Sequence, residues 1–236
     1  MMRALIVDDE LPAREELQAL LQESGEFAVV GSCGNAMEAL REVRKLTPEV
    51  MFLDIQMPAV SGFELLSMID QEIMPSVVFV TAYDEFAVKA FEEEALDYLV
   101  KPVEKQRLAK TVRKLKEAET TGQHPVYATP AIQNIPCVMT NRIKLIGIAE
   151  VDYVRSDPAG VSVICPKGEF FTELTLRVLE NKTNLVRCHK QFLVNLDHVD
   201  EILLQENLLA RIKMKSGATV PVSRRFLKRL KERIGI

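Results

Sequence analysis

Three acidic residues stand where strands of a predicted alternating pattern end. Asp8 and Asp9 directly follow the apolar run 4–7, and Asp54 directly follows the run 50–53. Carboxylates that converge on one point repel one another unless a cation joins them, and oxygen ligands of this kind suit Mg²⁺. A sharp exit from its strand would expose Asp54 as a nucleophile for phosphoryl transfer. These residues therefore predict a magnesium-dependent phosphoryl-transfer site.

Two further polar residues follow later strands of the same pattern. Thr81 comes after the apolar run 77–80, and Lys101 comes after the run 98–100. The Lys101 ammonium could balance one phosphoryl oxygen while the Thr81 hydroxyl donates to another. Taken singly, a strand-end threonine, an Asp-Asp pair or a Lys-Pro dipeptide is ordinary turn chemistry. The prediction therefore depends on their joint occurrence in this order.

The elements that would position these residues alternate along the first half of the chain. Predicted strands cover 4–7, 28–33, 50–53, 77–80 and 98–100. Predicted helices begin at Pro12 and then cover 36–43, 63–69, 88–95 and 104–119. Such alternation predicts a parallel sheet with helices on both faces, whose ligands bind at the carboxyl ends of the strands. We expect an α/β unit over residues 1–119, with a flavodoxin-like, doubly wound, five-stranded parallel sheet.

The segments that carry these residues resemble those of response-regulator receiver domains: LIVDDE (5–10), FLDIQMP (52–58), FVTAYDE (79–85) and DYLVKP (97–102). The resemblance implies that Asp54 is the phosphoacceptor. It further implies Mg²⁺ bound by Asp8, Asp9, Asp54 and the backbone carbonyl of Gln56, phosphoryl contacts from Thr81 and Lys101, a switch formed by Thr81 and Tyr98, and a cis Lys101–Pro102 peptide. An aspartyl-phosphate enzyme of the haloacid dehalogenase kind would need D-x-D-x-T after the first strand. The sequence there is DDE (8–10), so this alternative is excluded.

Receivers take their phosphoryl group from a sensor histidine kinase. The resemblance therefore implies a kinase partner and no catalysis beyond the chain's own phosphoryl transfer. Phosphorylation adds about −1.5 to −2 of charge. In receivers Thr81 then moves inward and Tyr98 follows, which repacks the face made by the fourth helix, the fifth strand and the fifth helix. We expect this face to form a homodimer when Asp54 is phosphorylated.

The second half of the chain differs in charge and in pattern. Residues 1–124 hold 13 Lys and Arg against 23 Asp and Glu, a net charge of −10, whereas residues 125–236 hold 17 against 11, a net charge of +6. A basic half suggests a polyanion as partner. Prolines, threonines and a glycine predict a linker over 120–134. Residues 135–236 then predict a mostly-β domain, with strands over 142–148, 151–155, 161–165, 168–172, 210–215 and 219–222 and helices over 174–181 and 224–234.

Basic residues gather at two places in this half. Arg187 and Lys190 precede a strand-like run, and Arg224 and Arg225 open the terminal helix behind Ser223 at the N-cap position. Cations in a first turn oppose the helix macrodipole, but the N–H groups at such a helix start attract anions. The pattern indicates a phosphate backbone at the helix start, and a solvated charged face is the alternative.

Two stretches resemble the best markers of LytTR DNA-binding domains: LVRCHKQFLVNLDHV (185–199) and TVPVSRRFLKRL (219–230). The resemblance implies contacts to direct repeats in successive major grooves of DNA. It assigns the main contacts to Lys190 and Arg225, with Arg224 and Arg187 as further DNA-binding residues. It also implies a contact from the loop 157–160 and a structural role for His189.

The chain as a whole is similar to the BtsR-like, or YehT-like, subgroup of these regulators. The similarity is carried by IPC (135–137), FTELTLR (171–177) and RLKERIG (229–235). Regulators of this subgroup pair with membrane-embedded LytS-type histidine kinases. A kinase of that type is therefore the implied partner.

Two other interpretations of the basic half stay open. A signalling adaptor could use it to bind a protein or a membrane surface, although the terminal helix needs its apolar face for packing, so we expect no direct membrane binding. RNA binding would require exposed aromatic side chains for base stacking, whereas the aromatics of this half occur in core-like contexts: Tyr153, Phe170, Phe171, Phe192 and Phe226. Sequence preference for duplex DNA would separate these interpretations.

Composition narrows the class of protein further. No segment is apolar for the length of a membrane span, and the early acidic residues exclude a signal peptide, so we expect a cytoplasmic protein. The four cysteines lack metal-ligand spacing and are expected to be reduced, buried or half-buried thiols. Signatures of serine hydrolases, P-loop proteins and zinc proteases are missing from the sequence, so no catalytic second half is predicted.

Overall fold

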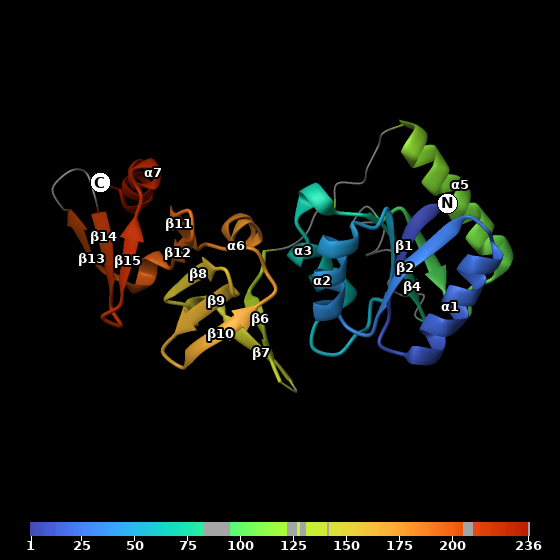
Figure 1. Cartoon of the computed structure of the whole chain (residues 1–236), viewed down its shortest axis with the longest axis horizontal. Helices are drawn as coiled ribbons and strands as arrows, with labels where there is room; N and C mark the ends of the chain where they lie inside the picture. The colour runs from blue at the N-terminus through green and yellow to red at the C-terminus, as the bar shows by residue number, and fades with distance from the viewer. Residues whose placement is uncertain (83–94, 122–126, 128–130, 141, 205–209, 236) are drawn as a thin grey trace. The chain divides into compact units, whose positions relative to one another are not determined.

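The computed structural model describes residues 1–82, 95–121, 127, 131–140, 142–204 and 210–235. They form two compact units, Met1–Pro130 and Ala131–Ile236, each with its own sheets and helices (Figure 1). None of the described helices combines the length and apolarity that a membrane span needs.

The first unit alternates strands and helices, as the spacing of apolar residues predicts. Its strands are β1 (Met2–Val7), β2 (Phe27–Cys33), β3 (Val50–Leu53), β4 (Ser76–Thr81) and β5 (Asp97–Val100). Its helical elements are α1 (Leu11–Glu23), α2 (Ala36–Leu46), α3 (Gly62–Met68), the 3₁₀ turn η1 (Gln71–Ile73) and α5 (Lys105–Thr121). Residues 88–94 of the predicted fourth helix lie outside the described residues.

The five strands form a parallel sheet in the order β2-β1-β3-β4-β5. This is the flavodoxin-like order, and the predicted α/β fold is confirmed. The order reverses between β1 and β3, which is where such sheets bind their ligands. Val7 pairs with Leu53 in the register of these two strands. The next residues, Asp8 and Asp54, therefore leave the sheet side by side.

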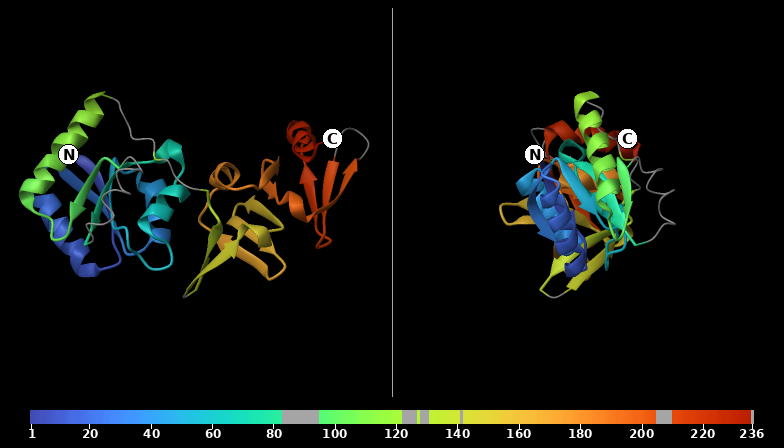
Figure 2. Two further views of the ribbon diagram at one scale, coloured as in Figure 1. Left: turned by 180° about the vertical axis from the view of Figure 1, so that it is seen from behind. Right: turned by 90° about the vertical axis from the view of Figure 1, so that its right-hand side faces the viewer.

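Helices cover both faces of this sheet. In two views from opposite sides, α1 and α5 lie against one face, and α2 and α3 lie against the other (Figures 1 and 2). Leu17 and Leu21 of α1 share a buried cluster with Leu108 of α5 and with Ile6 and Phe52 of the sheet. Val112 and Leu115 belong to the same cluster, so α5 buries three apolar residues that are spaced three or four positions apart. Removing this surface from water is the main source of the unit's stability.

Part of the predicted linker belongs to the first unit. The Tyr127 side chain is buried, and its hydroxyl accepts a hydrogen bond of 2.7 Å from the backbone N–H of Val77 in β4. Burial raises the pKa of the Tyr127 phenol. The chain after α5 is thus anchored by one aromatic residue, which composition alone does not indicate.

The second unit is built mainly from antiparallel strands. Its larger sheet has seven strands: β6 (Asn134–Met139), β7 (Arg142–Gly147), β8 (Tyr153–Asp157), β9 (Gly160–Cys165), β10 (Gly168–Thr172), β11 (Val186–His189) and β12 (Phe192–Val194), in the order β11-β12-β8-β9-β10-β6-β7. A second sheet holds β13 (Val199–Leu204), β14 (Ala210–Met214) and β15 (Thr219–Val222). The helical elements are η3 (Ile148–Glu150), α6 (Leu176–Lys182), η4 (Leu196–His198) and α7 (Arg224–Ile234).

A buried cluster joins the two sheets of this unit to α7. Cys188 and Val194 of the larger sheet pack with Ile212 and Val220 of the smaller sheet and with Leu230 of α7. The mostly-β prediction is confirmed, although β6, β11 and β13 are absent from the predicted strands. Strand β13 is missing from the prediction because its side chains are exposed or half-buried and show no alternation of apolar and polar residues. All four cysteines are buried and unpaired, as predicted.

One predicted core aromatic is in fact exposed. Phe171 of β10 is 52% exposed, so its assignment to a core-like context is wrong. Side chains alternate between the two faces of a strand, and Thr172, its neighbour, is buried on the opposite face. A run of two adjacent phenylalanines in a strand cannot place both of them in one core.

Candidate functional site

Three carboxylates converge at the carboxyl ends of β1 and β3. One ligand oxygen from each of Asp8, Asp9 and Asp54 lies within 4.8 Å of the other two. Asp8 and Asp54 are buried, while Asp9 is exposed. Oxygen donors at this spacing fit a hard divalent cation that keeps several waters. The structure thus brings together the three side chains that the sequence predicts as an acidic metal site.

Lys101 lies among these carboxylates. Its Nζ is 2.6 Å from Asp8 Oδ2 and 2.7 Å from Asp54 Oδ2, and the Lys101–Pro102 peptide is cis, as predicted. Thr81, at the end of β4, is fully buried. Within the described part of the chain its hydroxyl has no hydrogen-bond partner. A buried hydroxyl without a partner is costly, so this one is available to a group that enters the site.

Burial and charge act against each other in this cluster. Burial raises the pKa of Asp8; Lys101 opposes this shift, and the neighbouring Asp54 carboxylate adds to it. Burial alone would lower the pKa of Lys101, but its hydrogen bonds to Asp54 and Asp8 prevail and raise it. Lys101 therefore stays a cation, which allows two buried carboxylates to lie close together.

The loop after Asp54 turns directly into α3. The Gln56 N–H donates to Asp54 Oδ1 at 3.2 Å, which orients the carboxylate. Gly62, the first residue of α3, leaves no room for a side chain, because a Cβ there would lie 2.3 Å from the carbonyl oxygen of Asp54. Gly62 is not among the site residues predicted from the sequence. The available signal was a glycine at a helix start, directly after Ser61, whose capping box with Glu64 begins the helix.

Tyr98, the predicted switch residue, lies in β5 next to the strand of Thr81, since Thr81 pairs with Val100 in the register. The Tyr98 side chain is half-buried. Its backbone carbonyl accepts a hydrogen bond of 2.7 Å from Arg107 Nη2 on α5. Strand β5 and helix α5 are thereby joined at this position.

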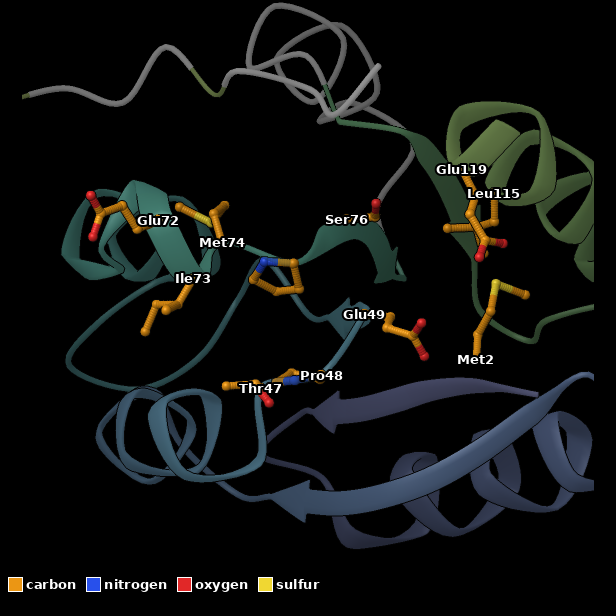
Figure 3. Close-up of a pocket in the computed structure, with 11 residues that line it drawn as sticks. Met2, Thr47, Pro48, Glu49, Glu72, Ile73, Met74, Ser76, Leu115 and Glu119 are labelled. Carbon is orange, nitrogen blue, oxygen red and sulfur yellow. The ribbon is translucent and has the colours of Figure 1, made fainter. Parts of the chain in front are cut away.

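A cavity of about 300 Å³ opens elsewhere on this unit (Figure 3). Met2 at the start of β1, Glu49 before β3 and Ser76 at the start of β4 contribute to its lining. These residues lie at the amino ends of the strands, whereas Asp8 and Asp54 follow the carboxyl ends. The cavity is therefore not part of the acidic site.

The predicted DNA-contacting segments of the second unit are linked by backbone hydrogen bonds. The Ser156 N–H, at the end of β8, donates to the Gln191 carbonyl in the β11–β12 turn at 2.8 Å. The Ser223 N–H, before α7, donates to the Cys188 carbonyl at 3.0 Å. The tight turn 157–160, the turn that carries Lys190 and the start of α7 are therefore neighbours.

The four residues predicted to bind DNA differ in their surroundings. Lys190, Arg224 and Arg225 are exposed. The Arg187 side chain is only 17% exposed, and it donates hydrogen bonds to the carbonyls of its own turn. Ser223 occupies the N-cap position of α7, as predicted, but its side chain makes no capping hydrogen bond. The N–H groups at this helix start are therefore not capped by the serine.

His189 lies within the same turn as Lys190. Its Nδ1 accepts a hydrogen bond of 3.2 Å from the Gln191 N–H, and its ring packs edge-on near Phe192. Burial lowers the pKa of this imidazole, and the cationic Lys190 and Arg187 lower it further. These contacts agree with the structural role predicted for His189.

Comparison with known proteins agrees with this geometry. Residues 4–113 match the family model of the response regulator receiver domain, and residues 141–235 match that of the LytTr DNA-binding domain. A response regulatory protein of Vibrio cholerae serotype O1 is 52% identical over 235 residues, which cover 100% of this chain and 99% of the relative. The transcriptional regulatory protein BtsR of Escherichia coli (strain K12) is 49% identical over 241 residues, and both chains are covered completely.

Among solved structures, the response regulatory domain of protein mrkE from Klebsiella pneumoniae is similar to the first unit. It is 34% identical with a TM-score of 0.46, and the match covers 51% of this chain and 99% of that chain. The two family matches fall on the two units of the fold, and the sequence similarity to BtsR proteins extends over the full length. The chain therefore belongs to the two-component response regulators that join a receiver domain to a LytTR DNA-binding domain and regulate transcription.

Proposed function

We propose that Asp54 is the phosphoacceptor and that Mg²⁺ binds beside it. Asp8, Asp9 and Asp54 would supply carboxylate oxygens, and Gln56 would supply its backbone carbonyl. The metal would neutralise charge on the incoming phosphoryl group. Three converging oxygen donors with one buried pair fit such an ion. The site then works by positioning and charge rather than by a separate acid or base.

In the proposed transfer, an Asp54 carboxylate oxygen attacks the phosphorus of a kinase phosphohistidine. The new P–O bond forms as the P–N bond breaks, and the imidazole nitrogen keeps the electron pair. The Lys101 ammonium holds one phosphoryl oxygen, and the Thr81 hydroxyl donates to another. The observation that carries this proposal is the position of Lys101 Nζ between Asp8 and Asp54, at 2.6 and 2.7 Å.

Phosphorylation would then act through Thr81 and Tyr98. The buried Thr81 hydroxyl gains its partner by moving toward the phosphoryl group, and Tyr98 follows. This motion would change the surface of β5 and α5 and promote a homodimer through that surface. We propose that the donor is a membrane-bound LytS-type histidine kinase, as for BtsR-like regulators, and that the chain works in the cytoplasm on the same side as the kinase's phosphohistidine.

For the second unit we propose sequence-specific binding to two direct repeats of duplex DNA. Lys190 and Arg225 would enter successive major grooves, where an arginine can read guanine with two hydrogen bonds. Arg224 and the uncapped start of α7 would contact phosphates. Arg187 would contribute through the turn that carries Lys190. Residues 120–134 would link receiver and DNA-binding domain, with Tyr127 as an anchor on the receiver side.

Affinity selection from random duplex DNA tests this function. The full chain is used with Mg²⁺ and beryllofluoride, which mimics the phosphoryl group. We expect two short direct repeats about one helical turn apart. In parallel, acetyl phosphate should drive dimerisation of the wild-type chain and not of Asp54→Ala, as measured by light scattering.

The two assays test different parts of the proposed function, so one part can be contradicted while the other stands. Dimerisation that persists in the Asp54→Ala chain would contradict the phosphoacceptor assignment. Recovery of no motif, with binding that ignores sequence, would leave the receiver proposal intact and favour an adaptor. Preference for single-stranded RNA in a matched selection would favour RNA binding instead.

A further inference from the structure

The Arg187 guanidinium is engaged within the domain on several sides. Its Nε donates to the His189 carbonyl at 2.9 Å, and its Nη2 donates to the Lys190 carbonyl at 2.7 Å. Its Nη1 lies 3.7 Å from Oε2 of Glu180 on α6. One planar cation thus fixes the backbone of the turn that presents Lys190, because its donors are held in a rigid fork.

The Glu180 carboxylate contacts a second arginine. Its Oε1 accepts a hydrogen bond of 2.8 Å from Nη1 of Arg229 on α7, while Oε2 faces Arg187. The Glu180 side chain is 19% exposed, so its charge is partly shielded from water. A single carboxylate therefore joins α6 to the turn of Lys190 and to the terminal helix.

The contact between Arg229 and Glu180 depends on the orientation of α7, the helix that also carries Arg225. The two residues are four positions apart, so they lie on one face of α7. The start of α7 is fixed to β11 by the hydrogen bond from Ser223 to Cys188, and Leu230 buries its apolar face. The contact from Glu180 adds a restraint one turn beyond Arg225. Rotation of α7 about its axis would break this contact and move Arg225.

We infer that Glu180 is a positioning residue for DNA recognition, because its carboxylate sets the spacing between Lys190 and Arg225. The inference rests on the proposed function, in which these two side chains contact DNA. The Arg229 side chain is 52% exposed, and ion pairs with an exposed partner contribute little to stability. The effect of Glu180 should therefore appear in the selectivity of DNA binding rather than in thermal stability.

Two substitutions break this bridge with opposite changes of charge. Glu180→Gln makes the domain more positive by one unit, and Arg229→Gln makes it less positive by one unit. The full chain with Mg²⁺ and beryllofluoride is measured against a duplex selected by the wild-type chain and against the same duplex with shuffled bases. Binding to the shuffled duplex should tighten for Glu180→Gln and weaken for Arg229→Gln. The ratio of the two affinities should fall about tenfold in both, the scale of one lost base contact.

Glu232→Gln is the matched control. Glu232 is an exposed residue of α7 that lies 3.9 Å from Lys228 on the same helix, so its ion pair joins no separate elements. Glu232→Gln makes the same charge change as Glu180→Gln, but the ratio of the affinities for the selected and the shuffled duplex should stay at the wild-type value. Arg225→Ala is run in parallel, since the proposed function requires that it lower the ratio.

The outcomes separate the inference from the proposed function. If Arg225→Ala lowers the ratio while Glu180→Gln and Arg229→Gln leave it unchanged, the role of Glu180 is overturned and the proposed contact stands. If Arg225→Ala leaves the ratio unchanged, the proposed contact fails, and the inference fails with it. A fall confined to Glu180→Gln and accompanied by a lower melting temperature would mark a merely structural residue, which also overturns the inference.

Discussion

At the scale of single residues, Lys101 explains how two buried carboxylates can lie close together in the candidate phosphorylation site. Asp8 and Asp54 are both buried, and two neighbouring carboxylates repel each other unless a cation joins them. Lys101 supplies that cation from the end of β5. In the proposed function, Mg²⁺ would take over part of this neutralisation, and Lys101 would then contact an oxygen of the incoming phosphoryl group.

Gly62 gives a sharper test of how tightly the site is packed. A Cβ in Gly62→Ala would lie 2.3 Å from the Asp54 carbonyl oxygen, which is backbone and cannot rotate away. Overpacking of this kind costs about 1–3 kcal/mol. We expect the receiver unit of this variant to lose that much stability in urea unfolding. The displaced Asp54 backbone should also slow phosphorylation by acetyl phosphate.

Gly34→Ala is the matched control for this prediction. Its Cβ would meet only the end of the flexible Arg14 side chain, at 3.4 Å. Stability and phosphorylation rate should therefore stay near the wild-type values. A Gly62→Ala chain that unfolds and reacts like the wild type would contradict the close approach of α3 to Asp54.

The site residues show which roles could be predicted from the sequence and which could not. Asp8, Asp54 and Lys101 could be grouped because each follows a predicted strand, and parallel strands bring their carboxyl ends to one edge. Gly62 could not be assigned to the site from the sequence, because its role depends on how the loop after Asp54 folds back on itself. Arg187 was grouped with the exposed arginines since charge alone does not reveal that its guanidinium binds carbonyls of its own turn.

At the scale of elements, a buried charge cluster joins β5 to α5. The Asp97 carboxylate is buried in β5. It accepts hydrogen bonds from Arg107 at 2.6 and 2.7 Å, from Thr111 at 2.7 Å and from Lys114 at 2.8 Å. Three successive turns of α5 thus bind one side chain of the strand. This cluster holds in place the two described elements of the proposed dimerisation surface.

The cluster predicts a stability that depends on pH. Burial alone would raise the pKa of Asp97, but the hydrogen bonds from Arg107, Lys114 and Thr111 prevail and hold it well below its ordinary value. A carboxyl whose pKa is lowered by folding stabilises the folded state above about pH 4, and this contribution is lost as the pH falls through its folded pKa. Asp97→Asn should cost about 3 kcal/mol at pH 7.

Urea unfolding of residues 1–130 at pH 7, 4 and 3 checks this prediction. The stability gap between wild type and Asp97→Asn should narrow below about pH 4. Glu117→Gln, which removes an exposed carboxylate from α5, should show no such gap at any pH. A gap for Asp97→Asn that is equally large at pH 7 and pH 3 would mean that the carboxylate charge does not supply the stability.

Helices and strands could be predicted from the sequence where one of their faces is buried and the other is exposed to solvent. Helix α5 is an example, because its buried Leu108, Val112 and Leu115 repeat at helical spacing. The Asp97 cluster was not predictable in the same way, since periodicity describes apolar positions and assigns no partner to a polar one. Strand β11 was missed because Arg187 occupies its half-buried face and was interpreted as part of a basic cluster.

At the scale of the whole molecule, the two units carry opposite charge. The acidic residues fall mainly in the first unit and the basic residues in the second, since residues 1–124 carry −10 and residues 125–236 carry +6. A polyanion such as DNA is repelled by the first and attracted by the second. Each unit has its own buried core, so the second can be tested apart from the first.

This asymmetry predicts that the receiver weakens non-specific DNA binding through its charge. Residues 131–236 alone should bind a shuffled duplex more tightly than the full unphosphorylated chain at low salt. The difference should shrink as salt rises, because the screening length falls from about 30 Å at 0.01 M to about 8 Å at 0.15 M. Fluorescence anisotropy across this salt range measures both affinities. A difference that stays constant with salt would point to steric cover of the DNA-binding surface by the receiver, and charge would then not be the cause.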